Sequence, residues 1–211
     1  MNRTLIAFII IVVLGLGVLI LATNNGGSGN NPDANILDAT APQSVIIPTV
    51  KQSTPMPTFT PITATKATIT TAKGTIQLIL YPQDAPKAAT NFATLAKNKF
   101  YDGLTFHRVE PGFVIQGGDP SGNGTGGYSI YGKPFEDELN PETPSYKEGY
   151  KEGVLAMANS GPNTNGSQFF IMWQDNEQLP HNYTIFGKVT EGMDVVHKIV
   201  AGDKMTSITV E

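Results

Sequence analysis

The 211-residue sequence contains no cysteine. This absence excludes disulfide bonds, thiolate metal sites, a cysteine nucleophile and lipidation at an N-terminal cysteine. Charged residues are also scarce, at 15% of the chain, and the net charge is −4, whereas nucleic-acid binding normally needs a basic patch. The three histidines, His107, His181 and His197, lack the helical spacing of metal ligands. We therefore expect no metal ion, no cofactor and no nucleic-acid partner.

One long apolar run stands at the N-terminus. Leu5–Ala22 comprises 18 consecutive apolar or glycine residues, and a helix of that length spans about 27 Å, close to the ~30 Å hydrocarbon core of a bilayer. Arg3 precedes the run and the next positive residue is Lys51, so the positive-inside rule places the C-terminal part outside the cytoplasm. We expect residues 1–22 to be an uncleaved signal anchor. The alternative is a signal peptide cleaved near Thr23, which would release a secreted protein.

Residues 23–66 have the composition of a linker. They contain six prolines, eight threonines, five asparagines and only four charged residues. Pro55, Pro57 and Pro61 favour an extended, polyproline-like chain. We expect a flexible, disordered tether between the anchor and a globular domain spanning residues 67–211.

From residue 67 onward the pattern is that of a packed, mainly β domain. Short apolar runs between glycine, proline and asparagine predict eight strands, at residues 68–72, 75–81, 104–109, 113–115, 153–157, 168–172, 185–189 and 206–210. Two helices are predicted, one capped by Asp84 and ending near Lys99, the other over Glu191–Ala201. These elements predict an antiparallel barrel or sandwich capped by two helices, rather than alternating βαβ units.

Two further segments are open to more than one interpretation. Gly122–Gly127 matches the GxGxxG pattern, but a dinucleotide site needs that pattern between a buried strand and a helix. Since no helical pattern follows, we interpret the segment as a loop that lets a ligand approach the backbone closely. Residues 136–138, Glu-Asp-Glu, are interpreted as a solvated acidic loop.

Strand alternation suggests how polar side chains are placed. Arg108 lies inside a predicted strand, where it is either a surface residue or a fixed donor in a pocket. Alternation places His107 on the opposite face from Arg108. In the strand over residues 168–172, the same rule places Gln168 and Phe170 on one face, a polar donor beside an aromatic wall.

Four segments together carry a highly specific set of motifs. The sequence reads FHR-x-x-x-GF-x-x-QGGD over residues 106–119, GTGG over 124–127, MAN-x-GPNTNGSQFF over 157–170 and FGKV over 186–189. In these motifs the chain resembles the cyclophilin family of peptidyl-prolyl cis/trans isomerases. The resemblance covers residues 67–211 and none of residues 1–66. It implies a mainly β fold, an eight-stranded antiparallel cyclophilin-like barrel capped by two helices, here preceded by the transmembrane helix and the disordered linker.

The resemblance also implies a function and a set of site residues. The activity is isomerisation of X-Pro bonds in proline-containing polypeptides, assisting the folding of exported proteins. Arg108 is implied as the catalytic donor, and the implied substrate-binding residues are Phe113, Val114, Gln116, Gly124, Ala158, Asn159, Ser160, Gln168, Phe170, Leu179 and Tyr183. Val114 and Tyr183 depart from the methionine and histidine common in the family. We expect a monomeric, membrane-anchored enzyme of bacterial type; the alternative is a cyclophilin fold that only binds proline-containing peptides.

Overall fold

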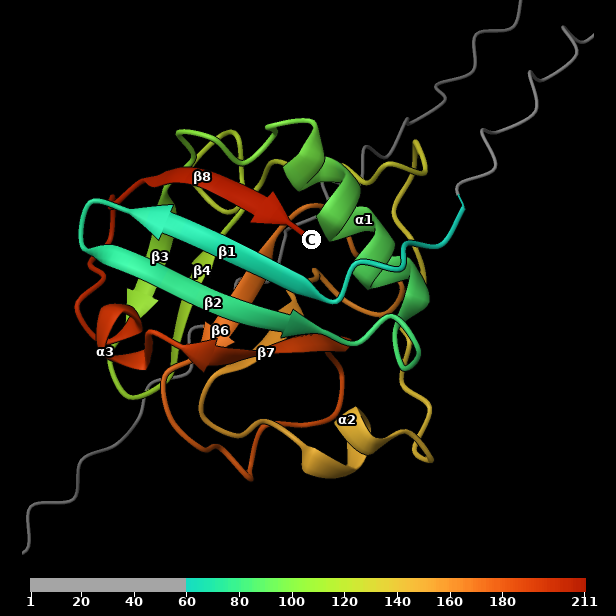
Figure 1. Cartoon of the computed structure of the whole chain (residues 1–211). Helices are drawn as coiled ribbons and strands as arrows, with labels where there is room; N and C mark the ends of the chain where they lie inside the picture. The colour runs from blue at the N-terminus through green and yellow to red at the C-terminus, as the bar shows by residue number, and fades with distance from the viewer. Residues whose placement is uncertain (1–59) are drawn as a thin grey trace, which may run out of the picture. The chain divides into compact units, whose positions relative to one another are not determined.

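A computed structural model describes residues 60–211 (Figure 1). The predicted anchor, residues 1–22, and the predicted linker up to residue 59 lie outside the described residues. Within residues 60–211, no helix is long and apolar enough to cross a membrane.

Eight strands form a single antiparallel sheet in the order β3-β4-β6-β5-β7-β2-β1-β8. Every predicted strand is present, with ends within two residues of those expected. The strands are β1 (Lys66–Thr71), β2 (Gly74–Leu80), β3 (Phe106–Glu110), β4 (Val114–Gly117), β5 (Val154–Met157), β6 (Phe169–Met172), β7 (Ile185–Glu191) and β8 (Met205–Val210).

The sheet curls into a half-barrel, with β1 and β2 in front of β3, β4 and β6 in Figure 1. A bridge between Thr105 and Lys204 joins the chain just before β3 to the chain just before β8. Along β2, Ile76, Leu78 and Leu80 are buried while the residues between them are exposed. This alternation is what an antiparallel sheet with one core face requires, and it explains why the strands could be predicted.

The first predicted helix is present as α1 (Pro86–Lys97), but its cap differs from the prediction. The N-cap residue is Ala85, which makes no side-chain cap hydrogen bond, so the predicted role of Asp84 is wrong. The Glu138 carboxylate instead accepts hydrogen bonds from the backbone N–H groups of Lys87 (3.0 Å) and Ala88 (2.9 Å). Glu138 is therefore not part of a solvated acidic loop: it stabilises the positive end of α1 from another part of the chain.

The second predicted helix is much shorter than expected. Strand β7 continues to Glu191, which pairs with Gln77 of β2, and α3 covers only Met193–Val196. Gly192 separates the two with φ of +93°, and a Cβ there would lie 2.3 Å from the carbonyl oxygen of Thr75. A further short helix, α2 (Pro144–Glu148), was not predicted.

The core is organised around aromatic rings. Phe92 of α1 meets Tyr101, Phe169 and Phe186 at ring-centroid distances of 5.3, 5.3 and 5.4 Å. The alternation predicted for β6 is confirmed: Phe169 belongs to this main core, whereas Phe170 belongs to a second apolar cluster. That second cluster forms the floor of the candidate site.

Candidate active site

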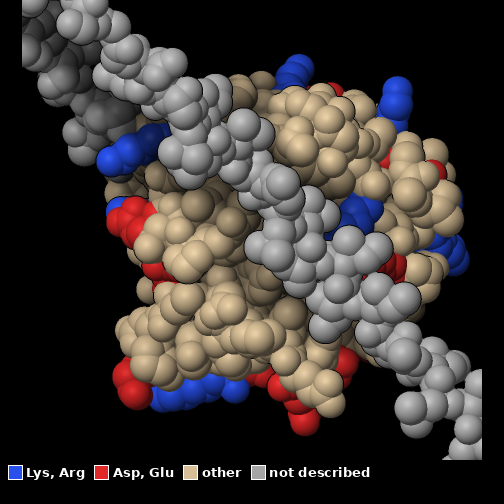
Figure 2. Space-filling view, turned by 180° about the vertical axis from the view of Figure 1, so that it is seen from behind, with Lys and Arg blue, Asp and Glu red and all other residues tan. Residues whose placement is uncertain are grey.

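A pocket of about 390 Å³ opens beside β3, β4 and β6. We call it the apolar pocket; it is lined by His107, Arg108, Phe113, Val114, Gln116, Asn123, Gly124, Ala158, Asn159, Phe170, Leu179 and Tyr183. These include ten of the twelve site residues predicted from the sequence, all except Ser160 and Gln168. In Figure 2, which shows the face opposite that of Figure 1, most of the visible charged side chains lie towards the margin.

Aromatic packing shapes one wall of the apolar pocket. The Tyr183 ring meets the edge of Phe170 at 5.4 Å between centroids. The Tyr150 hydroxyl donates to the Tyr183 carbonyl oxygen (2.9 Å) and accepts from the Tyr183 N–H (3.0 Å). Tyr183 is thus fixed through its backbone, and its ring keeps this wall amphipathic.

Arg108 is a fixed donor at the open edge of this pocket. Its Nε donates to Glu110 Oε1 at 2.9 Å and its Nη1 donates to Gln116 Oε1 at 3.1 Å. The guanidinium carbon lies 5.5 Å from the centre of the Phe113 ring. Because 44% of the side chain is still exposed, Arg108 is both held in place and accessible to a ligand.

A chain of amides continues from Arg108 to the glycine-rich loop. Gln116 Nε2 donates to Gln168 Oε1 at 3.0 Å, and Gln168 Nε2 donates to the carbonyl oxygens of Gly124 (3.0 Å) and Gly126 (2.8 Å). Since the guanidinium only donates and the carbonyls only accept, each amide has one permitted orientation. The loop therefore helps to set the position of Arg108.

Asp119 organises the backbone of that loop. Its buried carboxylate accepts hydrogen bonds from the backbone N–H groups of Ser121 (2.7 Å), Asn123 (3.0 Å) and Gly124 (2.6 Å). Burial opposes ionisation of this group, but the backbone donors outweigh burial and hold the pKa of Asp119 below its usual value. Gly124, with φ of +87°, supplies a backbone conformation that other residues rarely adopt.

His107 lines the apolar pocket together with Arg108, so the prediction that they face opposite sides is wrong. The register of β3 against β4 shifts between Phe106 and Arg108, and such a bulge breaks the alternation of side chains. Both ring nitrogens of His107 are buried and have no hydrogen-bond partner among the described residues. Burial lowers the His107 pKa, and Arg108 lowers it further while Asp119 raises it. His107 and Asn123 line the pocket but were not among the site residues predicted from the sequence; for Asn123, the neighbouring Gly124 was the available signal.

A second pocket of about 310 Å³ adjoins the apolar pocket and is lined by many glycines. We call it the glycine pocket; it is lined by Gln116, Gly124, Thr125, Gly126, Gly127, Tyr128, Ser129, Gly132, Lys133, Pro134, Ala158, Asn159, Ser160, Thr164, Gly166, Ser167 and Gln168. Ser160 and Gln168, the two predicted site residues absent from the apolar pocket, lie here. The two pockets share four residues, namely Gln116, Gly124, Ala158 and Asn159. One extended polypeptide can therefore occupy both pockets.

Comparison with known proteins places the chain in a family. The family model for cyclophilin type peptidyl-prolyl cis-trans isomerases matches residues 66–210. The chain belongs to the cyclophilin family. Peptidyl-prolyl cis/trans isomerisation is accordingly its activity, and proline-containing peptides are its substrates.

Relatives of this cyclophilin share about half of its aligned residues. The Neurospora crassa peptidyl-prolyl cis-trans isomerase-like 1 is 50% identical over 139 residues, which cover 64% of this chain and 81% of that protein. The human protein of the same description is 50% identical over 129 residues, covering 61% of this chain and 75% of that protein. The Schizosaccharomyces pombe peptidyl-prolyl cis-trans isomerase 9 is 50% identical over 137 residues, or 65% of this chain, but these are only 22% of that longer protein.

A solved structure supports the same assignment of the fold. A Cryptosporidium parvum cyclophilin type peptidyl-prolyl cis-trans isomerase has a TM-score of 0.64 and 36% sequence identity to this cyclophilin, covering 70% of this chain and 98% of the other. The same protein was also crystallised in the presence of the dipeptide Ala-Pro, with a TM-score of 0.63. The fold prediction is confirmed for a mainly β, eight-stranded antiparallel half-barrel. These relatives are all eukaryotic, so they do not support the expectation of a bacterial type.

Proposed function

We propose that Arg108 is the catalytic residue of this isomerase and that the apolar pocket holds the substrate proline. Resonance stiffens the X-Pro amide, so the bond isomerises over a barrier of about 18–20 kcal/mol. In the twisted transition state the prolyl nitrogen regains a lone pair, which a fixed N–H donor can bind. A donor that binds this nitrogen only in the twisted state lowers the barrier without over-stabilising either planar isomer.

The guanidinium of Arg108 at the edge of an apolar pocket is the observation that carries this proposal. Glu110 and Gln116 fix the guanidinium in place, so little reorganisation is needed when the amide twists. The apolar surface for a proline ring comes from five side chains of this pocket, namely Phe113, Val114, Phe170, Leu179 and Tyr183. Ala158, Asn159 and Ser160 would align the substrate backbone between the two pockets.

The experiment is NMR exchange spectroscopy on a short peptide containing Ala-Pro, with the full-length protein present at catalytic concentration. We expect cis/trans exchange to become much faster than the uncatalysed process, which takes tens to hundreds of seconds. If the peptide signals shift on binding but exchange stays at the uncatalysed rate, the domain is a recognition module and the catalytic role of Arg108 is wrong.

We further propose that the enzyme is monomeric and works outside the cytoplasm, held to a membrane by residues 1–22, where its clients are exported polypeptides. The 18-residue apolar run of Leu5–Ala22 and the positive residue that precedes it, Arg3, support this placement. N-terminal sequencing of the protein isolated from a membrane fraction is expected to recover the start of the chain. A sequence beginning near Thr23 would contradict the anchor and favour a secreted enzyme.

A further inference from the structure

The two pockets differ in charge from the domain that contains them. Residues 67–211 carry 11 basic and 16 acidic residues, so the domain as a whole is negative. Among the described residues that line the apolar and glycine pockets, however, only Arg108 and Lys133 are charged at neutral pH, and no carboxylate is present. Arg108 already pairs with Glu110, with Nη2 lying 2.8 Å from Oε1, so Lys133 is the charged lining residue left to attract a ligand of negative charge.

Lys133 stands on a segment whose backbone is fixed. The buried Ser129 hydroxyl donates to the Lys133 carbonyl oxygen and accepts from the N–H of Tyr131 at 3.1 Å. The side chain of Asn91, on α1, accepts from the N–H of Ile130 at 2.9 Å. These bonds fix the backbone from which the Lys133 side chain extends, at the rim of the glycine pocket.

The Lys133 ammonium is available to a ligand. Its side chain is exposed and forms no ion pair with any carboxylate of residues 60–211. The acidic residue that follows it, Glu136, already pairs with Lys87. A hydrogen bond from Lys87 is the main reason for the low pKa of Glu136, and the charge of Lys133 adds only a weaker, long-range contribution.

An exposed aromatic ring stands on the same rim. Tyr128 is 59% exposed and is one of three large apolar side chains exposed within the described part of the chain; of the three, only Tyr128 lines either pocket. Its ring packs against the edge of Phe100 with centroids 5.0 Å apart. An aromatic side chain held in this way contributes contact area at low entropic cost, as anchor residues do at protein interfaces.

We propose that the rim formed by Lys133 and Tyr128 makes the enzyme prefer polypeptides with an aspartate or glutamate close to the isomerised proline. This inference rests on the proposed function, since it places proline in the apolar pocket. An extended chain advances about 3.3 Å per residue, and the two pockets share four lining residues. Because the pockets adjoin, we expect the acidic residue one to three positions from the proline, where it would meet Lys133 while the substrate chain packs on Tyr128.

The test uses the full-length protein and peptides of equal length around one Ala-Pro bond. Each peptide carries aspartate, or its uncharged isostere asparagine, at one of the three positions on either side of that bond. We expect kcat/KM to be about threefold to fivefold higher for aspartate than for asparagine at one or two adjacent positions on one side only. Added salt is expected to reduce this ratio, because the interacting charges are exposed.

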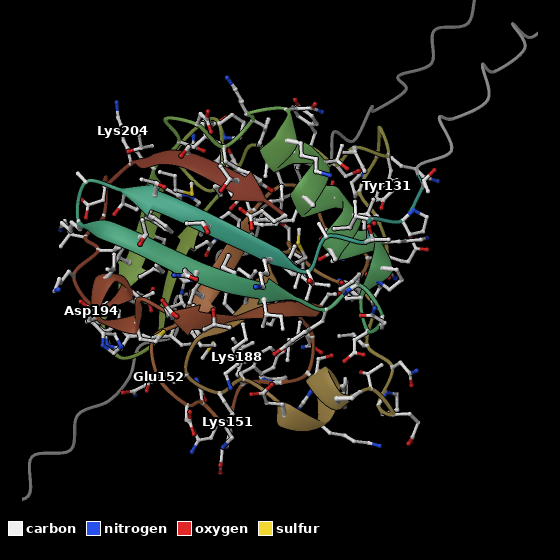
Figure 3. All side chains as sticks on the ribbon, viewed as in Figure 1. Tyr131, Lys151, Glu152, Lys188, Asp194 and Lys204 are labelled. Carbon is white, nitrogen blue, oxygen red and sulfur yellow. The ribbon has the colours of Figure 1, made fainter. Side chains whose placement is uncertain are left out.

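Matched variants assign the preference to Lys133. Lys133→Gln is expected to bring the aspartate-to-asparagine ratio to about one, because the ammonium is replaced by an uncharged polar group. Lys204→Gln is the control: Lys204 is exposed, points away from the ribbon in Figure 3 and lines neither pocket, so the ratio should be retained. Tyr128→Ala is expected to weaken the binding of both peptides while the ratio persists.

Peptide affinity, measured from chemical-shift changes in the same samples, separates this inference from the proposed function. Tighter binding of the aspartate peptides without faster exchange would support the rim and refute the catalytic role. Fast exchange with equal rates and equal affinities for both peptide series would support the catalytic role and refute the role of the rim. A preference that survives Lys133→Gln would also overturn the inference.

Discussion

Arg108→Ala is expected to lower kcat/KM for an Ala-Pro peptide by about tenfold to a hundredfold. A hydrogen bond from a charged donor contributes about 1.5–3 kcal/mol, and each 1.36 kcal/mol lost from transition-state binding is about a tenfold loss in rate. Because the bond is formed only as the amide twists, kcat should fall as much as kcat/KM while KM changes little. NMR exchange spectroscopy at several peptide concentrations measures both constants.

Two companion variants separate charge from geometry at this position. Arg108→Lys keeps the charge but lacks the planar fork that engages Glu110 and Gln116 together, so an intermediate rate is expected. Glu110→Gln removes the charged partner of Arg108 and should cause a smaller loss than Arg108→Ala. If the Arg108→Ala protein remains folded and its kcat stays within about twofold of the wild-type value, well short of a tenfold effect, then Arg108 does not perform the catalysis.

Asp119→Ala is expected to lower the free energy of unfolding by about 3 kcal/mol, because it leaves several backbone N–H groups without their charged acceptor. Three of these bonds, to Ser121, Asn123 and Gly124, fix the loop that lines both pockets. The variant should therefore also lose activity, since Gln168 depends on the carbonyl oxygen of Gly124. Urea unfolding followed by the fluorescence of the single tryptophan, Trp173, measures the stability.

The stabilising effect of Asp119 should depend on pH. The pKa of Asp119 lies below its usual value of 3.8 in the folded protein. Its contribution to stability is therefore fully present above that value and is lost as the pH falls through the folded-state pKa. The difference between wild type and Asp119→Ala should shrink below pH 3.8. Asp102→Ala, at an exposed carboxylate, is the control and should change stability little; a difference for Asp119→Ala that is independent of pH would contradict this account.

Strands were easier to predict from this sequence than helix ends. In β2, Ile76, Leu78 and Leu80 face the core and the residues between them are exposed. This alternation can be read from the local sequence alone, so the strand could be predicted. The helix over Glu191–Ala201 was predicted too long from the helical spacing of Met193, Val196 and Val200; Val196 is buried, but Val200 is 55% exposed. The sequence does not reveal that Glu191 pairs with Gln77 in the sheet, and this long-range pairing sets the start of the helix.

The residues of the site could be predicted where they belong to a sequence motif. Their placement was harder to predict where it depends on contacts between residues distant in sequence. Gln168 and Phe170 share a face because β6 alternates regularly. His107 does not obey the same rule because a bulge interrupts β3, and no residue type marks that bulge in advance. The carboxylate of Glu138 reaches α1 from 50 residues further along the chain, a contact that only the folded chain creates.

The wall shared by the two pockets has a consequence for how this enzyme can be retargeted. Changes at Gln116, Gly124, Ala158 or Asn159 alter both pockets at once, so they affect turnover together with selectivity. Lys133 and Tyr128 line only the glycine pocket. Single substitutions at Lys133 or Tyr128 can therefore change which substrates the enzyme prefers, in evolution or by design. They leave Arg108 and the apolar pocket around the isomerised bond unaltered.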